Sequence, residues 1–426
     1  MKRPHLSSAP SRRLLTGLGA AAALSLALAG CGGGDGGGEG GGAAGDNTVT
    51  VWHYFSADNQ VKLMDDYAKR FESEHQGAKV ENVYVPYDQM NSKVVSAAGN
   101  QSGPDIVVFN GAEAATLALA GGLAPLDEQW QGYQDADQFP DAVLHSIDDQ
   151  LYAVQGYVNL LGLWYNADIL DEIGVKPPTT LEELESAMAA SKDAGYSGIT
   201  LSGLPQSQGE WQAYPWLTSQ GWSYENLDEN ALAQGLAMAR GWVEKGYLSQ
   251  EATTWDQTVP FQQFTAGDVA FAANGNWQLG TAAADAKFKY GVVPLPVGSE
   301  GKVYLGGEGV GIGAFADDPD LAWEYLTSTY LDPEGEVLAA KNVGSIPARE
   351  DASQDPVVTG NPLLKPFATT LAENGASYPD PVVPAEAVAD TQTAMGQAWS
   401  AALGGQQEPE QLAADITAQL QSSTGQ

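Results

Sequence analysis

The sequence predicts an α/β protein, and three observations support this fold class. Stretches of β-branched and aromatic residues alternate with stretches whose apolar residues recur at helical spacing. Such alternation is typical of parallel sheets whose strands are joined by crossover helices. The 426 residues, at roughly 100–200 per domain, correspond to two or three domains or lobes. A hydrophobic content of 43% is sufficient for their cores.

The first strands and helices follow from these patterns. Residues 48–55, TVTVWHYF, predict a strand, and Asp58 is the candidate cap of the helix after it. Strands are predicted at 78–87 and 104–110, with a helix over 88–100 between them. Further along, Thr180 follows two prolines and precedes acidic residues, as a helix cap does. The later elements expected are helices near 228–246, 257–266, 318–331 and 333–341 and strands at 268–273 and 290–294.

The segment AFAANGNWQLG, which begins at residue 270, places Trp277 next to an Asn-Gly pair. Asn274 and Gly275 predict a turn, because both residue types tolerate the positive φ of tight turns. A tryptophan beside a turn either caps a core or stands on a loop to hold a ligand.

The charge and composition exclude several classes of partner. With 19 Lys and Arg against 54 Asp and Glu, the net charge is −35, and such a surface repels nucleic acid and anionic lipid head groups. Four histidines and one cysteine leave little material for metal or thiol chemistry, so no metal or cofactor is expected. His75 and His145 are interpreted as ordinary surface residues.

The first 47 residues predict export and membrane anchoring. Residues 1–30 have the basic head, apolar run and small-residue end of a signal peptide. Leu28-Ala29-Gly30-Cys31 resembles the lipobox of bacterial lipoproteins, which makes Cys31 the lipidation site; the alternative is an ordinary cleaved signal. A twin-arginine-like stretch at 11–15 leaves the export route open. Residues 31–47 form a glycine-rich tether, so we expect an extracytoplasmic protein anchored to a bacterial cell membrane.

No motif indicates catalysis. The sequence contains no phosphate loop, no His-Glu-x-x-His, no Gly-x-Ser-x-Gly and no calcium loop. Gly309-x-Gly311-x-x-Ala314 loosely fits a dinucleotide fingerprint but lacks the strand–helix setting that this motif needs. Because carboxylates are plentiful, a secreted glycoside hydrolase stays open as an alternative. The expected protein is not an enzyme.

Six segments occur in an order that resembles a known family: TVTVWHYFSADN, PDIVVFNGAEAATLALAGGLAPLDE, YVNLLGLWYNADILDEIGVKPPTTLEEL, FTAGDVAFAANGNW, YGVVPLPVG and GSIPARED. Together they resemble the extracellular solute-binding proteins of carbohydrate ABC importers, with maltose-binding protein as a distant relative. The resemblance implies a two-lobed, periplasmic-binding-protein-like fold of type II, each lobe a mainly parallel sheet flanked by helices. It places the hinge crossings near 155–160, 304–309 and 344–348. The implied division is 48–157 and 307–345 for the N-lobe and 158–306 and 346–426 for the C-lobe.

The resemblance also implies the function and the site. A monomeric lipoprotein would capture a neutral sugar or oligosaccharide between its lobes and deliver it to the ABC permease. Sugars require flat aromatic rings and short polar side chains in a concave pocket. Family correspondence selects these candidate ligand contacts: His53, Tyr54, Ser56, Asn110, Glu113, Tyr157, Asn159, Trp211, Tyr214, Trp277 and Glu308.

The sequence departs from maltose-binding protein at some of these positions. Ala112 and Glu113 stand where that protein has an Asp-Arg pair, and Asn159 stands at the position of an acidic ligand contact. Maltose is therefore only one candidate ligand. The same fold binding glycerol 3-phosphate or another phosphorylated solute is a second alternative, although lysine and arginine are scarce.

Overall fold

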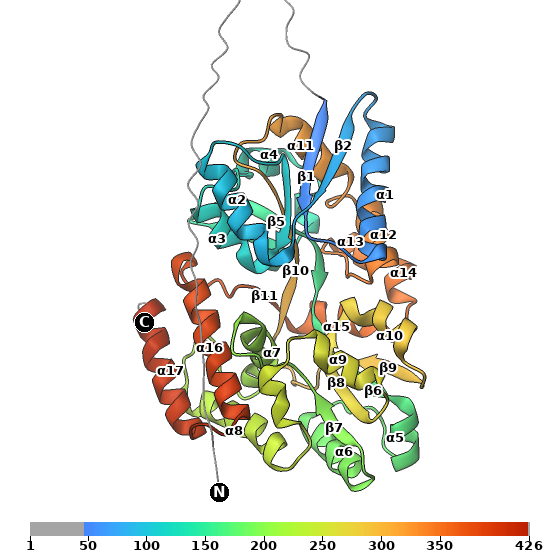
Figure 1. Ribbon diagram of the computed structural model, residues 1–426, viewed down its shortest axis with the longest axis vertical. Coiled ribbons are helices and arrows are strands. Elements are labelled where there is room, and N and C mark those ends of the chain that lie inside the picture. Colours follow the sequence, from blue (N-terminus) through green and yellow to red (C-terminus); the bar gives the residue numbers. More distant parts are fainter. Residues whose placement is uncertain (1–46, 425–426) are drawn as a thin grey trace, which may run out of the picture. The chain divides into compact units, whose positions relative to one another are not determined.

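The computed structural model describes residues 47–424, which form two β-sheets, each covered by helices (Figure 1). The predicted signal peptide, Cys31 and all but the last residue of the tether lie outside the described residues. Between residues 47 and 424, no helix combines the length and the apolar character that crossing a membrane requires.

The first sheet contains the N-terminal strands. Its order is β2-β1-β3-β10-β5-β4, and β11 pairs with one end of β10. β1 has alternating burial and β3 is buried on both faces, as their alternating and continuous apolar patterns predict. The strands are β1 (Thr48–His53), β2 (Lys79–Tyr84), β3 (Ile106–Asn110), β4 (Leu144–Ile147), β5 (Gln150–Asn159), β10 (Val303–Ile312) and β11 (Gly375–Ser377).

Helices from two separate parts of the chain cover this sheet. The predicted apolar stripe of α1 is buried through Leu63, Met64, Tyr67 and Phe71, and it packs on β2 and on α12. The helices of this group are α1 (Asp58–Glu74), α2 (Met90–Gly99), α3 (Ala114–Leu119), α4 (Asp127–Gly132), α11 (Pro319–Ser328), α12 (Pro333–Val343) and α13 (Glu350–Ser353).

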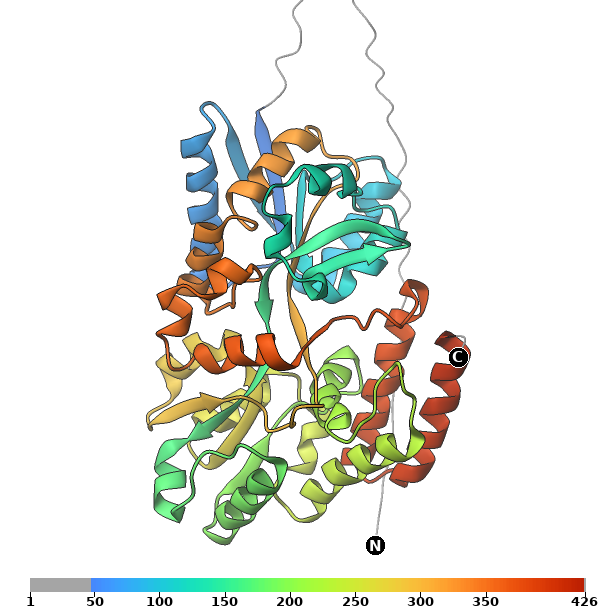
Figure 2. The same ribbon diagram turned by 180° about the vertical axis from the view of Figure 1, so that it is seen from behind.

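The second sheet has the order β7-β8-β6-β9, from β6 (Leu161–Asn166), β7 (Ser197–Thr200), β8 (Val269–Gly275) and β9 (Tyr290–Val293). Long helices from the C-terminal end, α16 and α17, pack on α7 and α8, and Figure 2 shows this group from behind. The helices are α5 (Ala167–Ile173), α6 (Leu181–Asp193), α7 (Ser207–Thr218), α8 (Glu229–Glu244), α9 (Thr258–Thr265), α10 (Leu279–Asp285), α14 (Pro356–Thr359), α15 (Lys365–Asn374), α16 (Val388–Leu403) and α17 (Pro409–Thr424).

Three chain segments connect the two sheets, and the first two do so near residues 155–160 and 304–309, as expected. β5 ends at Asn159 in the first sheet and β6 begins at Leu161 in the second. β10 starts beside α7 and continues into the first sheet, so Figures 1 and 2 both show it, in orange, between the sheets. The third segment passes through Ile346, which exchanges two backbone hydrogen bonds with Val158, of 2.7 and 3.0 Å.

The sheets are mixed rather than mainly parallel. β1 pairs in parallel with β2 and β3, and β7 with β8, but β10 runs antiparallel to both β3 and β5. The reason is that β5 and β10 are crossing strands with opposite directions, and β4 and β5 form a hairpin. Strand–helix alternation does not reveal such strands.

Three local predictions are corrected by the structure. Asp58 is the first helical residue and Ala57 the N-cap; Gln60 Oε1 accepts the Ala57 N–H at 3.2 Å. Asn274 and Gly275 do not form a turn, because β8 runs through both residues and Gly275 has a φ of −91°. His145 is buried, and burial lowers its pKa to about 4. The prediction that Thr180 caps a helix is confirmed, since its side chain accepts the Glu183 N–H at 3.2 Å at the start of α6.

Candidate functional site

A cavity of about 310 Å³ lies where the crossings meet the ends of both sheets. Asn159 of the first crossing and Gly306, Gly307 and Glu308 of the second form part of its lining. Its volume falls in the range of small-molecule sites. The remaining lining residues are Gln60, Tyr87, Asn110, Ala112 and Glu113 from the first-sheet side and Ser207, Gln208, Trp211, Asp256, Gln257, Thr258, Trp277 and Tyr378 from the second-sheet side.

Glu308 is a buried carboxyl group in this lining. It lies in β10 opposite Asn110 of β3, is 7% exposed, and its Oε2 accepts a hydrogen bond from the Tyr54 hydroxyl. Burial raises the pKa of Glu308 to about 8. The protonated form therefore predominates at neutral pH, and the group offers an O–H donor as well as acceptor oxygens.

The wall on the first-sheet side combines an amide, a carboxyl group and a phenol. Asn110 Oδ1 accepts the Ala112 N–H at 3.0 Å, and its Nδ2 donates to the Tyr87 hydroxyl at 3.2 Å. Glu113 Oε2 accepts Asn91 Nδ2 at 2.7 Å, and burial raises the pKa of Glu113. These bonds fix the direction of each polar group before a ligand arrives.

The opposite wall is aromatic, and glycines bring its rings close to the backbone. A Cβ atom on Gly275 would lie 1.8 Å from Cζ3 of Trp277, and one on Gly306 would lie 2.4 Å from Cη2 of Trp211. Both glycines therefore provide the space in which an indole ring lies. Gly306 makes room for the Trp211 ring, and this role does not depend on any bending of the second crossing.

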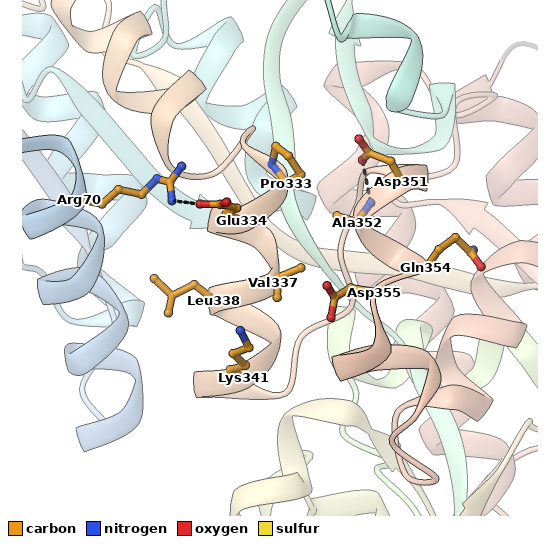
Figure 3. Close-up of a pocket in the computed structure, with 10 residues that line it drawn as sticks. All are labelled: Arg70, Pro333, Glu334, Val337, Leu338, Lys341, Asp351, Ala352, Gln354 and Asp355. Carbon is orange, nitrogen blue, oxygen red and sulfur yellow. Dashed lines mark hydrogen bonds and ion pairs between the residues drawn. The ribbon is translucent and has the colours of Figure 1, made fainter. Parts of the chain in front are cut away.

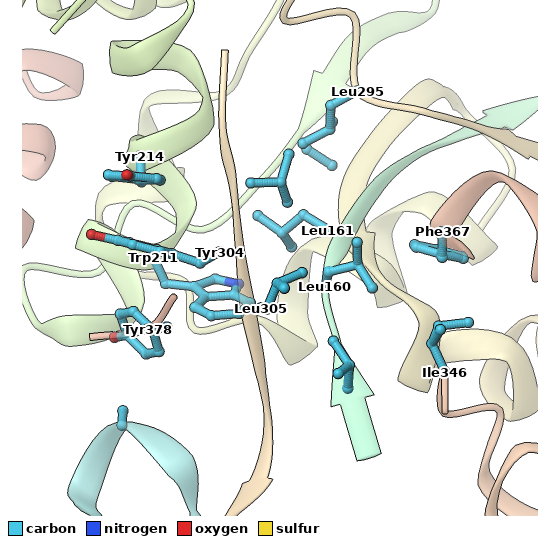
Figure 4. Packing of buried hydrophobic residues seen from close by; sticks show 14 of the residues in the cluster. Leu160, Leu161, Trp211, Tyr214, Leu295, Tyr304, Leu305, Ile346, Phe367 and Tyr378 are labelled. Carbon is cyan, nitrogen blue, oxygen red and sulfur yellow. The ribbon is translucent and has the colours of Figure 1, made fainter. Parts of the chain in front are cut away.

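Trp211 belongs to a larger aromatic stack (Figure 4). Its ring lies edge-on to Tyr378, with centroids 4.7 Å apart, and is stacked on Tyr304 at 5.8 Å. The carboxyl group of the preceding residue, Glu210, accepts hydrogen bonds from the Tyr304 hydroxyl at 2.7 Å and the Tyr224 hydroxyl at 3.2 Å. Burial raises the pKa of Glu210 to about 8. The stack holds the Trp211 ring at the cavity.

The described lining carries acidic side chains and no basic ones. Glu113, Asp256 and Glu308 contribute carboxyl groups, and no lysine, arginine or histidine is among the described residues that line the cavity. Nor do residues 47–424 contain a grouping of three or more His, Cys, Asp or Glu that could hold a metal ion. The arrangement offers acceptors, amides and aromatic faces to a ligand.

A larger hollow, of about 610 Å³, lies elsewhere, beside α1, α12 and α13 (Figure 3). Its Arg70 is already paired with Glu334 at 3.0 Å and Asp332 at 2.8 Å. None of the crossing residues described above lines it. The smaller cavity is the better candidate site because polar and aromatic groups from both sheets converge on it.

The sequence profile of bacterial extracellular solute-binding proteins matches residues 66–366. The chain belongs to this family. The resemblance noted in the sequence is thereby confirmed, and the family places this solute-binding protein outside the cytoplasm among binding proteins rather than enzymes.

Curated relatives of this solute-binding protein have similar lengths. The maltotriose-binding protein of Pyrococcus abyssi is 24% identical over 347 residues, which cover 77% of this chain and 72% of the relative. The melibiose/raffinose/stachyose-binding protein MelE of Bacillus subtilis is 24% identical over 64% of this chain and 67% of the relative. A maltooligosaccharide ABC transporter solute-binding lipoprotein of Streptococcus pneumoniae is 23% identical, covering 79% of this chain and 80% of the relative.

Solved structures confirm the two-lobed fold. The GacH receptor of Streptomyces glaucescens aligns with a TM-score of 0.77 at 24% identity, covering 89% of this chain and 98% of that one. Maltose-bound MalE3 of T. maritima aligns with a TM-score of 0.74 at 20% identity, covering 88% and 99%.

The structure brings six of the predicted contacts of this solute-binding protein to the cavity. These are Asn110, Glu113, Asn159, Trp211, Trp277 and Glu308. Tyr54 reaches it through its bond to Glu308 and lines an adjoining hollow of about 200 Å³. Ser56 is exposed just before α1 and does not line the cavity.

Three predicted contacts lie in the interior and are corrected. His53 is 4% exposed; its Nδ1 accepts the Phe55 N–H at 3.2 Å, and burial lowers its pKa to about 4. Tyr157 is buried beside Phe55, with ring centroids 6.5 Å apart. Tyr214 is buried against Tyr304, with centroids 3.6 Å apart. Sequence position near a contact loop does not show which way a side chain points.

Other lining residues were not predicted. Tyr87 comes just after β2, whose parallel partner β1 leads to Tyr54, so the rule that parallel strands end at one edge could have identified it. Tyr378 follows β11, far along the chain, and lines the cavity where it packs against Trp211 and Tyr304. No local pattern in the sequence marks it.

Proposed function

We propose that this solute-binding protein captures a neutral sugar or oligosaccharide in the cavity and delivers it to the permease of an ABC importer. The observation that supports this most is the combination of Trp211 and Trp277 with amide and carboxyl groups in one interlobe cavity. Apolar C–H faces of a sugar lie on aromatic rings, and its hydroxyls bond to the polar groups. The relatives described above, named for binding maltotriose, raffinose and maltooligosaccharides, support the same ligand class.

In this proposal one lobe comprises residues 48–157 with 307–353 and the other residues 158–306 with 354–426; the predicted boundary after residue 345 moves because α13 packs on α12 and Arg349 pairs with Asp135. Binding favours a closed arrangement in which both walls contact the sugar, and the permease accepts that arrangement. The protein acts as a monomer without bond cleavage. Lipidation at Cys31 and the tether hold it at the cell membrane. A C31A variant of the full chain tests the anchor: it should lose partitioning into detergent while keeping sugar affinity.

The principal experiment is a thermal-shift and calorimetric screen. Maltotriose, maltotetraose, raffinose, stachyose and mannotriose are added to the wild-type protein and to the W277A variant. We expect at least one sugar to raise the melting temperature of the wild type, because a ligand that binds only the folded state stabilises it. W277A should lose most of that shift.

The matched control is W323A, since Trp323 is also partly buried but lies in α11, outside the cavity. It should be less stable than the wild type and should keep the sugar-induced shift. A panel in which no sugar shifts the wild type would overturn the proposal.

The two alternatives make different predictions in the same screen. Glycerol 3-phosphate requires cationic donors, and the lining described above supplies none, so it should give no shift. A glycoside hydrolase would release reducing sugar from maltotetraose on long incubation. Release that persists in the wild type and stops in E308Q would replace the binding proposal by the hydrolase.

A further inference from the structure

The carboxamide of Asn276 joins two of the three crossings. Asn276 follows β8 and is fully buried. Its Oδ1 accepts the Leu160 N–H at 2.9 Å, and its Nδ2 donates to Asn159 Oδ1 at 2.8 Å and to the Gly344 carbonyl at 2.9 Å. One side chain of the second-sheet lobe thus contacts the first crossing at 159 and 160 and the beginning of the third at 344.

These partners determine the orientation of both amides. The two ends of an asparagine amide are distinguished by their hydrogen-bond partners. A backbone N–H only donates and a backbone carbonyl only accepts, so Leu160 and Gly344 leave Asn276 a single orientation. Asn276 therefore donates an N–H to Asn159, which accepts it through its side-chain oxygen. The NH₂ group of Asn159 is then the end that remains for other partners.

Asn159 is partly exposed and lines the cavity. We propose that Asn276 is a positioning residue that holds Asn159 with its NH₂ group as a hydrogen-bond donor to the ligand. This rests on the proposed function and names a specificity determinant within it. The lining offers both acceptors and donors, and the NH₂ group of Asn159 is one of its donors. The ligand must therefore place an acceptor oxygen, of a ring, a glycosidic bond or a hydroxyl, opposite Asn159.

The same network connects the ligand contact to the crossings. Leu160 and Ile346, both labelled in Figure 4, are fully buried, and Ile346 is bonded to Val158 in both directions. A movement that separates the first and third crossings must break the Asn276 bonds or carry Asn159 with it. A ligand held by Asn159 consequently favours the arrangement in which these crossings stay together.

The network is tested first without any sugar. Amide hydrogen exchange at Leu160 is measured by NMR in the wild type and in N276A, N276D and N159A. N276A removes the acceptor, so exchange should accelerate at least tenfold. N159A leaves the bond between Asn276 and Leu160 intact and should retain protection, whereas N276D sets a carboxylate against the Gly344 carbonyl and Asn159 Oδ1 and should lose protection as N276A does. Unchanged exchange in N276A would overturn the network whether or not a sugar binds.

The ligand role is then tested with maltotriose, or with whichever sugar of the panel stabilises the wild type. We expect N159A and N276A each to raise the Kd about tenfold, the upper range for one neutral hydrogen bond. The N159A/N276A double variant should bind no more weakly than N159A, because Asn276 acts through Asn159. If the increases in Kd of the two single variants multiplied in the double variant, Asn276 would have a general structural role that is independent of Asn159.

N159D is the matched variant for the direction of the bond. Its carboxylate still accepts from Asn276 but presents an acceptor, not a donor, to the ligand. It should keep the Leu160 protection and bind the sugar at least as weakly as N159A. Wild-type affinity in N159D would overturn the donor assignment. If no panel sugar binds the wild type, the proposed function and the ligand role fail together, and the exchange result still decides the network.

Discussion

Gly275→Ala is the sharpest perturbation that the structure offers at the cavity. The three atoms nearest to a Cβ at this position all belong to the Trp277 ring, at 1.8, 2.1 and 2.2 Å. The backbone of Gly275, with φ −91° and ψ 172°, is ordinary extended conformation that alanine adopts without strain. The substitution therefore acts first on the indole ring.

The size of the displacement follows from these distances. Ordinary van der Waals contact for a Cβ begins at 3.4 Å, so the ring must move by about 1.6 Å from its present 1.8 Å separation. Losing one well-placed aromatic contact costs about 1 kcal/mol, which corresponds to a roughly fivefold increase in Kd. Alanine also restricts the unfolded chain, which offsets part of any loss of stability by about 0.4–1 kcal/mol.

The assay is calorimetric titration with the best sugar of the panel, together with thermal unfolding. G280A is the control, because Gly280 lies in α10 and a Cβ added there would have no atom within 4 Å. It should bind like the wild type. Wild-type affinity in G275A combined with weak binding in W277A would refute the reasoning that the ring must rest on Gly275.

Three further predictions concern stability. Burial raises the pKa of Glu210 to about 8, so the folded protein retains a proton that the unfolded chain releases above about pH 4.5. The melting temperature of the wild type minus that of E210Q should therefore decrease as the pH rises from 5 to 8.5. A difference that stays constant over this range would contradict the prediction. T180A removes the cap of α6 and should cost about 1 kcal/mol in urea unfolding without changing sugar affinity. R349M removes a buried guanidinium that bonds Asp135 and Asp351. The free energy of unfolding should fall by about 2 kcal/mol and not more, because both carboxylates are half-exposed and water can solvate them. A stability equal to that of the wild type would contradict this prediction.

The local elements were largely predictable because their signals are local. The apolar stripe of α1 lies within one helix, and the cap at Thr180 depends on residues only three apart. The direction of β10 was not predictable, because its partners β3 and β5 are about 150 or more residues away. The supposed turn at Asn274 and Gly275 failed for a related reason: Gly275 is needed where the indole of Trp277 rests, and no positive φ is involved.

The sequence by itself determined the family, the alternation of strands and helices and the residue types that a sugar site needs. Only the tertiary structure decided which of those residues meet. It placed Glu308 and Trp211 in the cavity, turned His53 and Tyr214 into the core, and brought in Tyr378. The physical reason is that the cavity is built where three crossings and two sheet edges converge. Side-chain direction there depends on contacts between segments far apart in the chain, which periodicity does not encode.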